Sequence, residues 1–181
     1  PSVNEGLDVV GQAQTGTGKT AAFGIPLIES LDPRIRTVQG LVLVPTRELA
    51  VQVKIELERL AMFKGLKSVA VYGGQAIARQ LEAFRRGSHI IIATPGRLID
   101  HIGRRTLDLG QLRFLVLDEA DQMLDIGFAD DINKILRHVP SSRQTLLFSA
   151  TMPTSIRRLV HRYMKDPKWI LVGGDSEPSL L

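Results

Sequence analysis

Short apolar runs alternate with longer amphipathic stretches along the whole of this 181-residue chain. Most of the apolar runs are rich in β-branched or large aliphatic residues and contain no alternating polar positions. That pattern is typical of strands buried on both faces of a parallel sheet. The predicted strands are 8–10, 41–44, 68–71, 90–93, 114–117, 145–148 and 169–172.

Between the strands lie stretches whose apolar residues recur every three or four positions, which places them on one face of a helix. The first such face consists of Leu49, Val53, Leu57 and Leu60. The second consists of Ile132, Ile135, Leu136 and Val139, and Pro140 is expected to end that helix. The alternation of strands and helices predicts an α/β fold, a three-layer sandwich with a mostly parallel sheet, in which ligands bind beyond the carboxyl ends of the strands.

The amino-acid composition excludes some classes of function and favours others. The absence of cysteine excludes disulfides, cysteine zinc sites and thiol nucleophiles. No apolar run approaches the roughly 20 residues of a membrane span, so we expect no membrane partner. The first residues lack the features of a signal peptide, which favours a cytoplasmic protein, and the missing initial methionine suggests a fragment or a processed chain. A net charge of +4, mostly from arginine, favours a polyanionic partner, although a mildly basic surface explains it equally well.

A phosphate-binding loop is predicted directly after the first strand. Its sequence is Ala13-Gln14-Thr15-Gly16-Thr17-Gly18-Lys19-Thr20, which matches the P-loop except that Ala13 replaces the first glycine. The glycines let successive N–H groups face one anion, Lys19 would reach the β- and γ-phosphates, and the Thr20 hydroxyl would bind Mg²⁺. A flexible turn with a surface lysine is the alternative, and the flanking strand and helix argue against it.

Adjacent carboxylates follow the predicted strand 114–117. Asp118 would orient Mg²⁺ and Glu119 would polarise an attacking water as general base. Acidic residues also favour helix N-termini for electrostatic reasons, so this pair alone is equally consistent with a structural role. Together with the P-loop it indicates a nucleotide hydrolase, because both sequences serve the same Mg–nucleotide.

Asp118-Glu119-Ala120-Asp121 spells the name-giving motif of the DEAD-box RNA helicases, and other segments resemble motifs of that family in the same order. They are Ala13 to Thr20, Pro45-Thr46-Arg47-Glu48-Leu49-Ala50, Gly73-Gly74, Thr94-Pro95-Gly96-Arg97 and Ser149-Ala150-Thr151. The resemblance implies a RecA-like, ATP-binding helicase domain over residues 1–172, with an interdomain linker starting at 173–181.

The resemblance also implies roles for individual residues. Gln14, Thr15, Gly16, Thr17, Gly18, Lys19 and Thr20 would bind ATP, and Lys19, Asp118 and Glu119 would serve its hydrolysis. The implied contacts to the RNA backbone are Pro45, Thr46, Arg47, Gly74, Thr94, Gly96 and Arg97. None of these reads bases, so little sequence preference is expected. Ser149 and Thr151 would hydrogen-bond the segment containing Asp121 and couple the two ligands; capping the helix after Pro153 is the alternative.

Two family features have no counterpart in the sequence. The twelve residues before Ala13 contain no adenine-recognising glutamine motif, so adenine selectivity is inferred by analogy. A second RecA-like domain, the expected partner of this one in a monomeric helicase, is also missing, and with it the arginines that would stabilise the transferring phosphoryl group. We therefore expect slow hydrolysis from this chain alone.

Other functions stay open at this point. A DNA helicase or translocase with the same core is one, and an RNA-binding scaffold with a decayed nucleotide site is another. The intact Lys19, Thr20, Asp118 and Glu119 argue against decay. A domain that mainly docks partner proteins is a further possibility.

Overall fold

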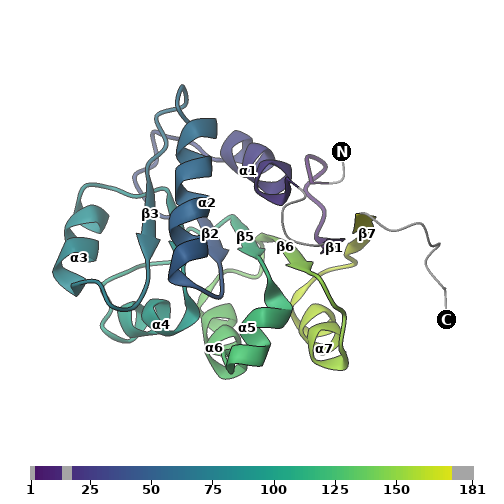
Figure 1. Ribbon diagram of the computed structural model, residues 1–181. Coiled ribbons are helices and arrows are strands. Elements are labelled where there is room, and N and C mark those ends of the chain that lie inside the picture. Colours follow the sequence, from purple (N-terminus) through teal and green to yellow (C-terminus); the bar gives the residue numbers. More distant parts are fainter. Residues whose placement is uncertain (1–2, 14–17, 173–181) are drawn as a thin grey trace.

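The middle layer of the molecule is a parallel sheet. The computed structural model describes residues 3–13 and 18–172 and places seven strands in the order β3-β4-β2-β5-β6-β1-β7 (Figure 1). The strands are β1 (Val9–Ala13), β2 (Gly40–Leu43), β3 (Ser68–Val71), β4 (Ile90–Ala93), β5 (Phe114–Leu117), β6 (Gln144–Ser149) and β7 (Lys168–Val172). Every neighbouring pair is parallel. All seven predicted strands are confirmed.

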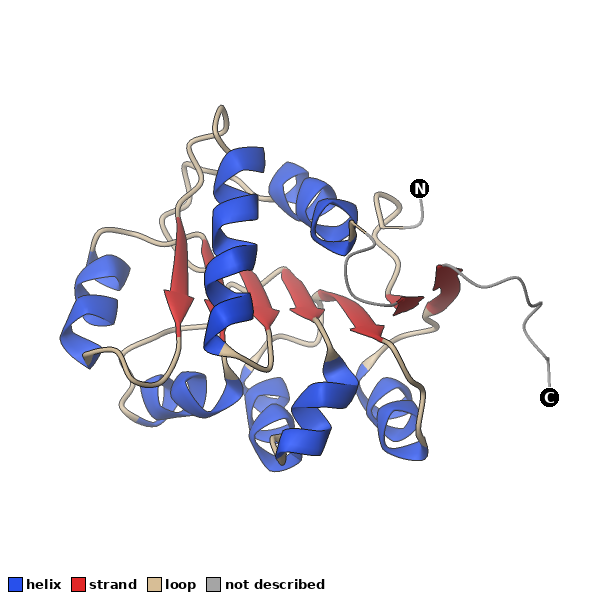
Figure 2. Cartoon of the chain, in the orientation of Figure 1, coloured by secondary structure: helices blue, strands red, loops and turns tan. Residues whose placement is uncertain are grey.

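Helices cover both faces of this sheet, as Figure 2 shows. They are α1 (Lys19–Ser30), α2 (Arg47–Leu60), α3 (Ile77–Arg85), α4 (Pro95–Gly103), α5 (Ala120–Ile126), α6 (Ala129–His138) and α7 (Thr154–Tyr163). Helices α1 and α2 lie on one face, and α4, α5, α6 and α7 lie on the other (Figure 1). The predicted three-layer α/β sandwich is therefore confirmed. Among the described residues, no helix has the length and apolar character that a membrane span needs.

Two separate apolar clusters, one on each face, hold the layers together. Strand β2 contributes to both: Leu41 and Leu43 belong to one cluster, Val42 belongs to the other, and all three are fully buried. Successive side chains of a strand point to opposite faces, so a strand covered on both sides must be apolar at every position. This is why the apolar runs of the sequence do not alternate with polar residues.

The predicted helix faces are buried except at Leu49, which is partly buried, and at Leu60. Val53 and Leu57 of α2 are fully buried, but Leu60, on the same predicted helix face, is 40% exposed. Leu60 is the last residue of α2 and lies beside Gly24 of α1, where the helical layer ends. On the opposite face, α6 buries Ile132, Ile135 and Leu136, and Val139 is buried just beyond its last turn.

The close packing of β1 against β6 gives a test of the fold. A Cβ atom added to Gly11 of β1 would lie 2.6 Å from Cδ1 of Phe148 in β6, well inside van der Waals contact. We expect Gly11→Ala to lower the free energy of unfolding by about 1–3 kcal/mol, the usual cost of overpacking a core.

Urea denaturation followed by circular dichroism measures this change. Gly103 at the end of α4 is the matched control, because an added Cβ there meets no atom within 4 Å. Gly103→Ala should change stability by no more than about 1 kcal/mol. An unaltered unfolding midpoint for Gly11→Ala would contradict the packing described here.

Candidate functional site

The first part of the candidate site is the start of α1. Gly18 caps this helix with φ of 75° and ψ of 19°, a left-handed conformation that glycine adopts without strain. Lys19 and Thr20 form the first turn and are half-buried. The other residues predicted to bind ATP, 14–17, lie outside the described residues. The predicted strand ends just before these residues at Ala13, and the predicted glycine and helix follow them at Gly18 and Lys19.

The second part is Asp118, which follows β5 and meets Lys19. Lys19 Nζ lies 3.5 Å from Asp118 Oδ1, and only 10% and 4% of the two side chains are exposed. Burial raises the pKa of Asp118 above its usual range, and the neighbouring Lys19 ammonium only partly offsets this. The lysine and the carboxylate that the sequence assigned to one nucleotide pocket therefore come together in the fold.

Glu119 stands beside this pair in a strained conformation. Its φ of 51° and ψ of 50° fall in the left-handed region, which is unfavourable for a residue with a Cβ atom. Such strain is concentrated at functional sites. Burial and the adjacent Asp118 raise the pKa of the Glu119 carboxyl, and a raised pKa suits a general base. Asp118 Oδ1 accepts a hydrogen bond of 3.0 Å from the Glu119 N–H.

Asp121 is joined to the segment after β6. Its Oδ2 accepts hydrogen bonds from Thr151 N (2.9 Å) and Thr151 Oγ1 (2.8 Å). Ser149 Oγ accepts from Asp121 N at 3.2 Å and donates to Thr151 O at 2.7 Å. Burial would raise the pKa of Asp121, but the bonds that Thr151 donates outweigh it and lower the pKa. The predicted contacts are confirmed. The alternative, capping of α7, is wrong, because the hydroxyls of Ser149 and Thr151 donate to Thr151 O and Asp121 Oδ2 instead.

The oxygen ligands in this part of the site suit a magnesium ion. Mg²⁺ prefers hard oxygen donors and is commonly held by one or two carboxylates together with phosphate oxygens and water. The carboxylate of Asp118 and the hydroxyl of Thr20 are such donors, and both belong to residues at the carboxyl edge of the sheet. These residues would hold the ion beside the phosphates of a nucleotide.

The predicted RNA contacts lie on the neighbouring half of the same edge, after β2, β3 and β4. Arg47, Gly74 and Gly96 are exposed, Thr46, Thr94 and Arg97 are half-buried, and Pro45 is buried. Thr46 is the N-cap of α2, with its Oγ1 accepting from Leu49 N at 3.2 Å, and Thr94 is the N-cap of α4. Two helix starts and two arginines thus share one surface, a suitable set of donors for phosphate oxygens.

Three further residues support this surface, and the sequence analysis missed them. The guanidinium of Arg47 lies 5.1 Å from the centre of the Tyr72 ring. Gln80 and His101 are buried and hydrogen-bonded to each other. The available signal was a polar residue on an apolar helix face: Gln80 falls between Ile77 and Phe84 at helical spacing.

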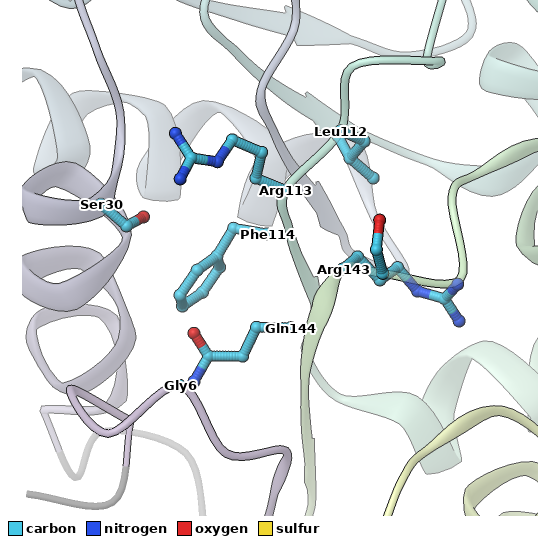
Figure 3. Close-up of a pocket in the computed structure, with 8 residues that line it drawn as sticks. Gly6, Ser30, Leu112, Arg113, Phe114, Arg143 and Gln144 are labelled. Carbon is cyan, nitrogen blue, oxygen red and sulfur yellow. The ribbon is translucent and has the colours of Figure 1, made fainter.

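A hollow of about 300 Å³ lies elsewhere, at the amino ends of β5 and β6 (Figure 3). Phe114 and Gln144, the first residues of these strands, help to line it. The side chains of Arg113 and Arg143 point away from each other in Figure 3. Arg143 donates to the carbonyls of Pro140 and Tyr163, so its charge serves the local structure. This hollow is at the opposite end of the sheet from every predicted site residue that the structure describes.

The raised pKa of Glu119 predicts a pH-dependent cost in stability. The folded state binds more protons than the unfolded chain in the window between the ordinary pKa of 4.5 and the raised one, so stability falls as pH rises through it. Above that window the cost is constant, and Glu119→Gln removes it. We expect this variant to melt at a higher temperature than wild type at neutral pH, by less than about 4 °C.

Thermal unfolding at several pH values measures the effect. The difference between Glu119→Gln and wild type should disappear below pH 4.5, where the glutamate is protonated in both states. Glu5, exposed near the amino terminus, provides a control that should melt as wild type does when changed to glutamine. A lower melting temperature for Glu119→Gln at neutral pH would refute this account of the site.

Comparison with known proteins identifies the family of the chain. A family model described as DEAD/DEAH box helicase matches residues 1–159. The chain is 53% identical over 177 residues to the ATP-dependent RNA helicase CshA of Listeria monocytogenes, covering 98% of the chain and 34% of that protein. It is 54% identical over 165 residues to the DEAD-box ATP-dependent RNA helicase CshA of Bacillus subtilis, covering 91% and 33%. The chain thus spans about a third of the length of these relatives.

Solved structures of DEAD-box proteins also superpose on this chain. A DEAD box protein from the hyperthermophile Methanococcus jannaschii superposes with a TM-score of 0.89 at 46% identity, covering 93% of this chain and 46% of that one. The yeast DEAD-box splicing factor Prp28 superposes with a TM-score of 0.88 at 34% identity, covering 94% and 42%. The RecA-like fold is therefore confirmed. Sequence and structure lead to one conclusion: the chain belongs to the DEAD/DEAH box helicase family.

Proposed function

We propose that residues 1–172 form the ATP-binding and RNA-binding half of a helicase core that hydrolyses ATP to remodel or locally unwind RNA. The observation that carries this proposal is the approach of Lys19 to Asp118, 3.5 Å apart and almost fully buried. Two opposite charges removed from water at the carboxyl edge of a parallel sheet, beside a glycine turn and a helix start, suit a triphosphate and its metal ion.

Each residue of the nucleotide site has a defined task in this proposal. Lys19 binds the β- and γ-phosphates, and Thr20 and Asp118 hold Mg²⁺. The ion would supply charge that stabilises the transferring phosphoryl group. Lys19 must then exchange its contact with Asp118 for contacts with phosphate oxygens. Glu119, held by its strained backbone next to Asp118, accepts a proton from the attacking water.

The RNA lies across the half of the edge formed by β2, β3 and β4. Arg47 and Arg97 pair with phosphates, and the N–H groups at the starts of α2 and α4 donate to phosphate oxygens. Contacts of this kind do not distinguish bases, so binding is independent of sequence. The relatives named as RNA helicases support RNA rather than DNA as the ligand.

In this proposal a second RecA-like domain completes the helicase core. ATP and RNA bind across the cleft between two domains, and closure bends the RNA. Asp121, Ser149 and Thr151 couple the sites, because their hydrogen bonds tie the turn containing Asp118 and Glu119 to the segment after β6. Each ligand then favours the closed state for the other, and the effect is reciprocal.

The nucleotide site predicts the effect of removing Lys19. We expect Lys19→Ala to lower the affinity for Mg–ATP by at least about 30-fold, because a desolvated charge contact to phosphate contributes about 2 kcal/mol or more. Isothermal titration calorimetry measures it. Lys54→Ala, which removes a lysine paired with Glu58 on the surface of α2, is the control and should bind as wild type does. Equal affinities for wild type and Lys19→Ala would exclude this lysine from the nucleotide site.

The need for a second domain predicts slow turnover. Arginines supplied by a partner domain accelerate phosphoryl transfer by about 10³–10⁵-fold. We therefore expect the 181-residue chain alone to release phosphate from ATP at least about 10³-fold more slowly than a complete helicase of the family under the same conditions. A phosphate-release assay with single-stranded RNA, and with DNA of the same sequence, measures this. RNA-stimulated turnover at the complete enzyme's rate would contradict the proposal, and stimulation by DNA alone would favour a DNA translocase.

A further inference from the structure

Gln80 of α3 is a buried amide with polar contacts to several elements. It is 1% exposed. Its Nε2 donates to Tyr72 O at 3.1 Å and to Gln75 Oε1 at 2.9 Å. Its Oε1 lies 2.6 Å from His101 Nε2 and 3.4 Å from Arg97 Nη1. Because both ends of the amide are paired, the Gln80 side chain is fixed in one position.

The carbonyl of Tyr72 determines the direction of these bonds. A carbonyl oxygen only accepts, so the NH₂ group of Gln80 must face it and Oε1 must face His101 and Arg97. His101 Nε2 therefore carries a hydrogen and donates to Gln80. His101 is fully buried, with Thr106 Oγ1 2.8 Å from Nδ1 and the Phe84 ring against its edge. The imidazole is thus held between α3 and the end of α4.

The Gln80 amide bonds directly to Arg97, a proposed RNA contact, and to the Tyr72 carbonyl, which lies near two others, Gly74 and Arg47. Arg97 Nη1 donates to Gln75 O at 2.8 Å as well as to Gln80. Tyr72 and Gln75 are the two ends of the turn that contains Gly74, whose φ is 82°. The Tyr72 ring also packs under the guanidinium of Arg47. One side chain thus connects the surfaces after β2, β3 and β4.

We propose that Gln80 and His101 are positioning residues for RNA binding: they hold Arg97 and the turn from Tyr72 to Gln75 in the arrangement that receives the sugar-phosphate backbone. This inference rests on the proposed function. Gln80 and His101 do not touch RNA, since both are buried. They fix the arginine and the glycine turn before the ligand arrives, which reduces the ordering cost of binding.

A double-mutant cycle in the 181-residue chain tests the role of Gln80. The variants are Gln80→Met, which keeps the side-chain length and removes the amide, Arg97→Ala, and the two combined. The readout is the dissociation constant for a fluorescein-labelled oligouridylate, measured by anisotropy at fixed salt. We expect each single variant to bind about three- to tenfold more weakly, and the double variant to lose clearly less than the product of the two single losses.

Gln39 provides the matched control for a loss of stability. It too is 1% exposed, and its Nε2 donates to the carbonyls of Asp32 and Ile35, but it precedes β2 at the opposite end of the sheet. Gln39→Met should lower the melting temperature as Gln80→Met does while leaving oligouridylate affinity unchanged. Both variants should bind Mg–ATP as wild type does, because neither residue lies at the nucleotide site.

The role of His101 is tested by a pair of substitutions. His101→Gln keeps a donor for Gln80 Oε1 and should bind oligouridylate within about twofold of wild type. His101→Leu keeps the apolar volume, removes the donor and should lose affinity as Gln80→Met does. A purely structural role would make the two variants equally weak.

The outcomes separate this inference from the proposed function. If Arg97→Ala loses affinity while Gln80→Met and His101→Leu bind as wild type does, the positioning role is overturned and the RNA site stands. Single losses that multiply in the double variant overturn the positioning role as well. If Arg97→Ala binds as tightly as wild type, the RNA site itself is contradicted, and this inference falls with it.

Discussion

The strand order of the parallel sheet is the constraint on which the rest of the structure depends. All seven strands run in the same direction, so every segment that follows a strand emerges at one edge. The order β3-β4-β2-β5-β6-β1-β7 then sorts these segments. Those after β3, β4 and β2 adjoin one another, and so do those after β5, β6 and β1. Motifs scattered from residue 13 to residue 151 are thereby collected into two neighbouring surfaces, one proposed to bind RNA and one proposed to bind nucleotide.

The proposed nucleotide surface carries features that are unfavourable for the stability of the fold. Lys19, Asp118 and Glu119 place an ammonium and two carboxylates where burial disfavours charge, and Glu119 also occupies a left-handed backbone conformation. Side chains chosen for stability alone would be apolar here, as they are throughout the two clusters. The strands that lead into this edge, β5 and β6, each pair with a strand on both sides, and all their residues except Gln144 are buried.

The sequence predicts some of these features well and others not at all, for identifiable physical reasons. Strands such as 90–93 were predicted to the residue because burial on both faces leaves an uninterrupted apolar run. Lys19 and Asp118 were assigned to one pocket because both motifs are expected to bind the same Mg–nucleotide. Gln80 and His101 were missed because their importance lies in contacts with other helices, which spacing along one helix does not encode. Leu60 lies on the predicted helix face and is still exposed, because periodicity gives a helix face and not the extent of its burial.

The boundary between the two surfaces constrains how ATP and RNA influence each other. Strands β2 and β5 are neighbours, and Asp118 N donates to Leu43 O at 2.9 Å, so the backbone that carries the carboxylate is bonded to the strand that leads to Arg47. Both strands are buried along their whole length, and a packed sheet does not deform continuously. Bending of this sheet is therefore a poor route for coupling. The hydrogen bonds that Asp121 makes with Ser149 and Thr151 lie beyond the carboxyl end of β6 and join the start of α5 to the segment after that strand. In the proposed function, movement of the second domain rather than bending of the sheet would act through this connection.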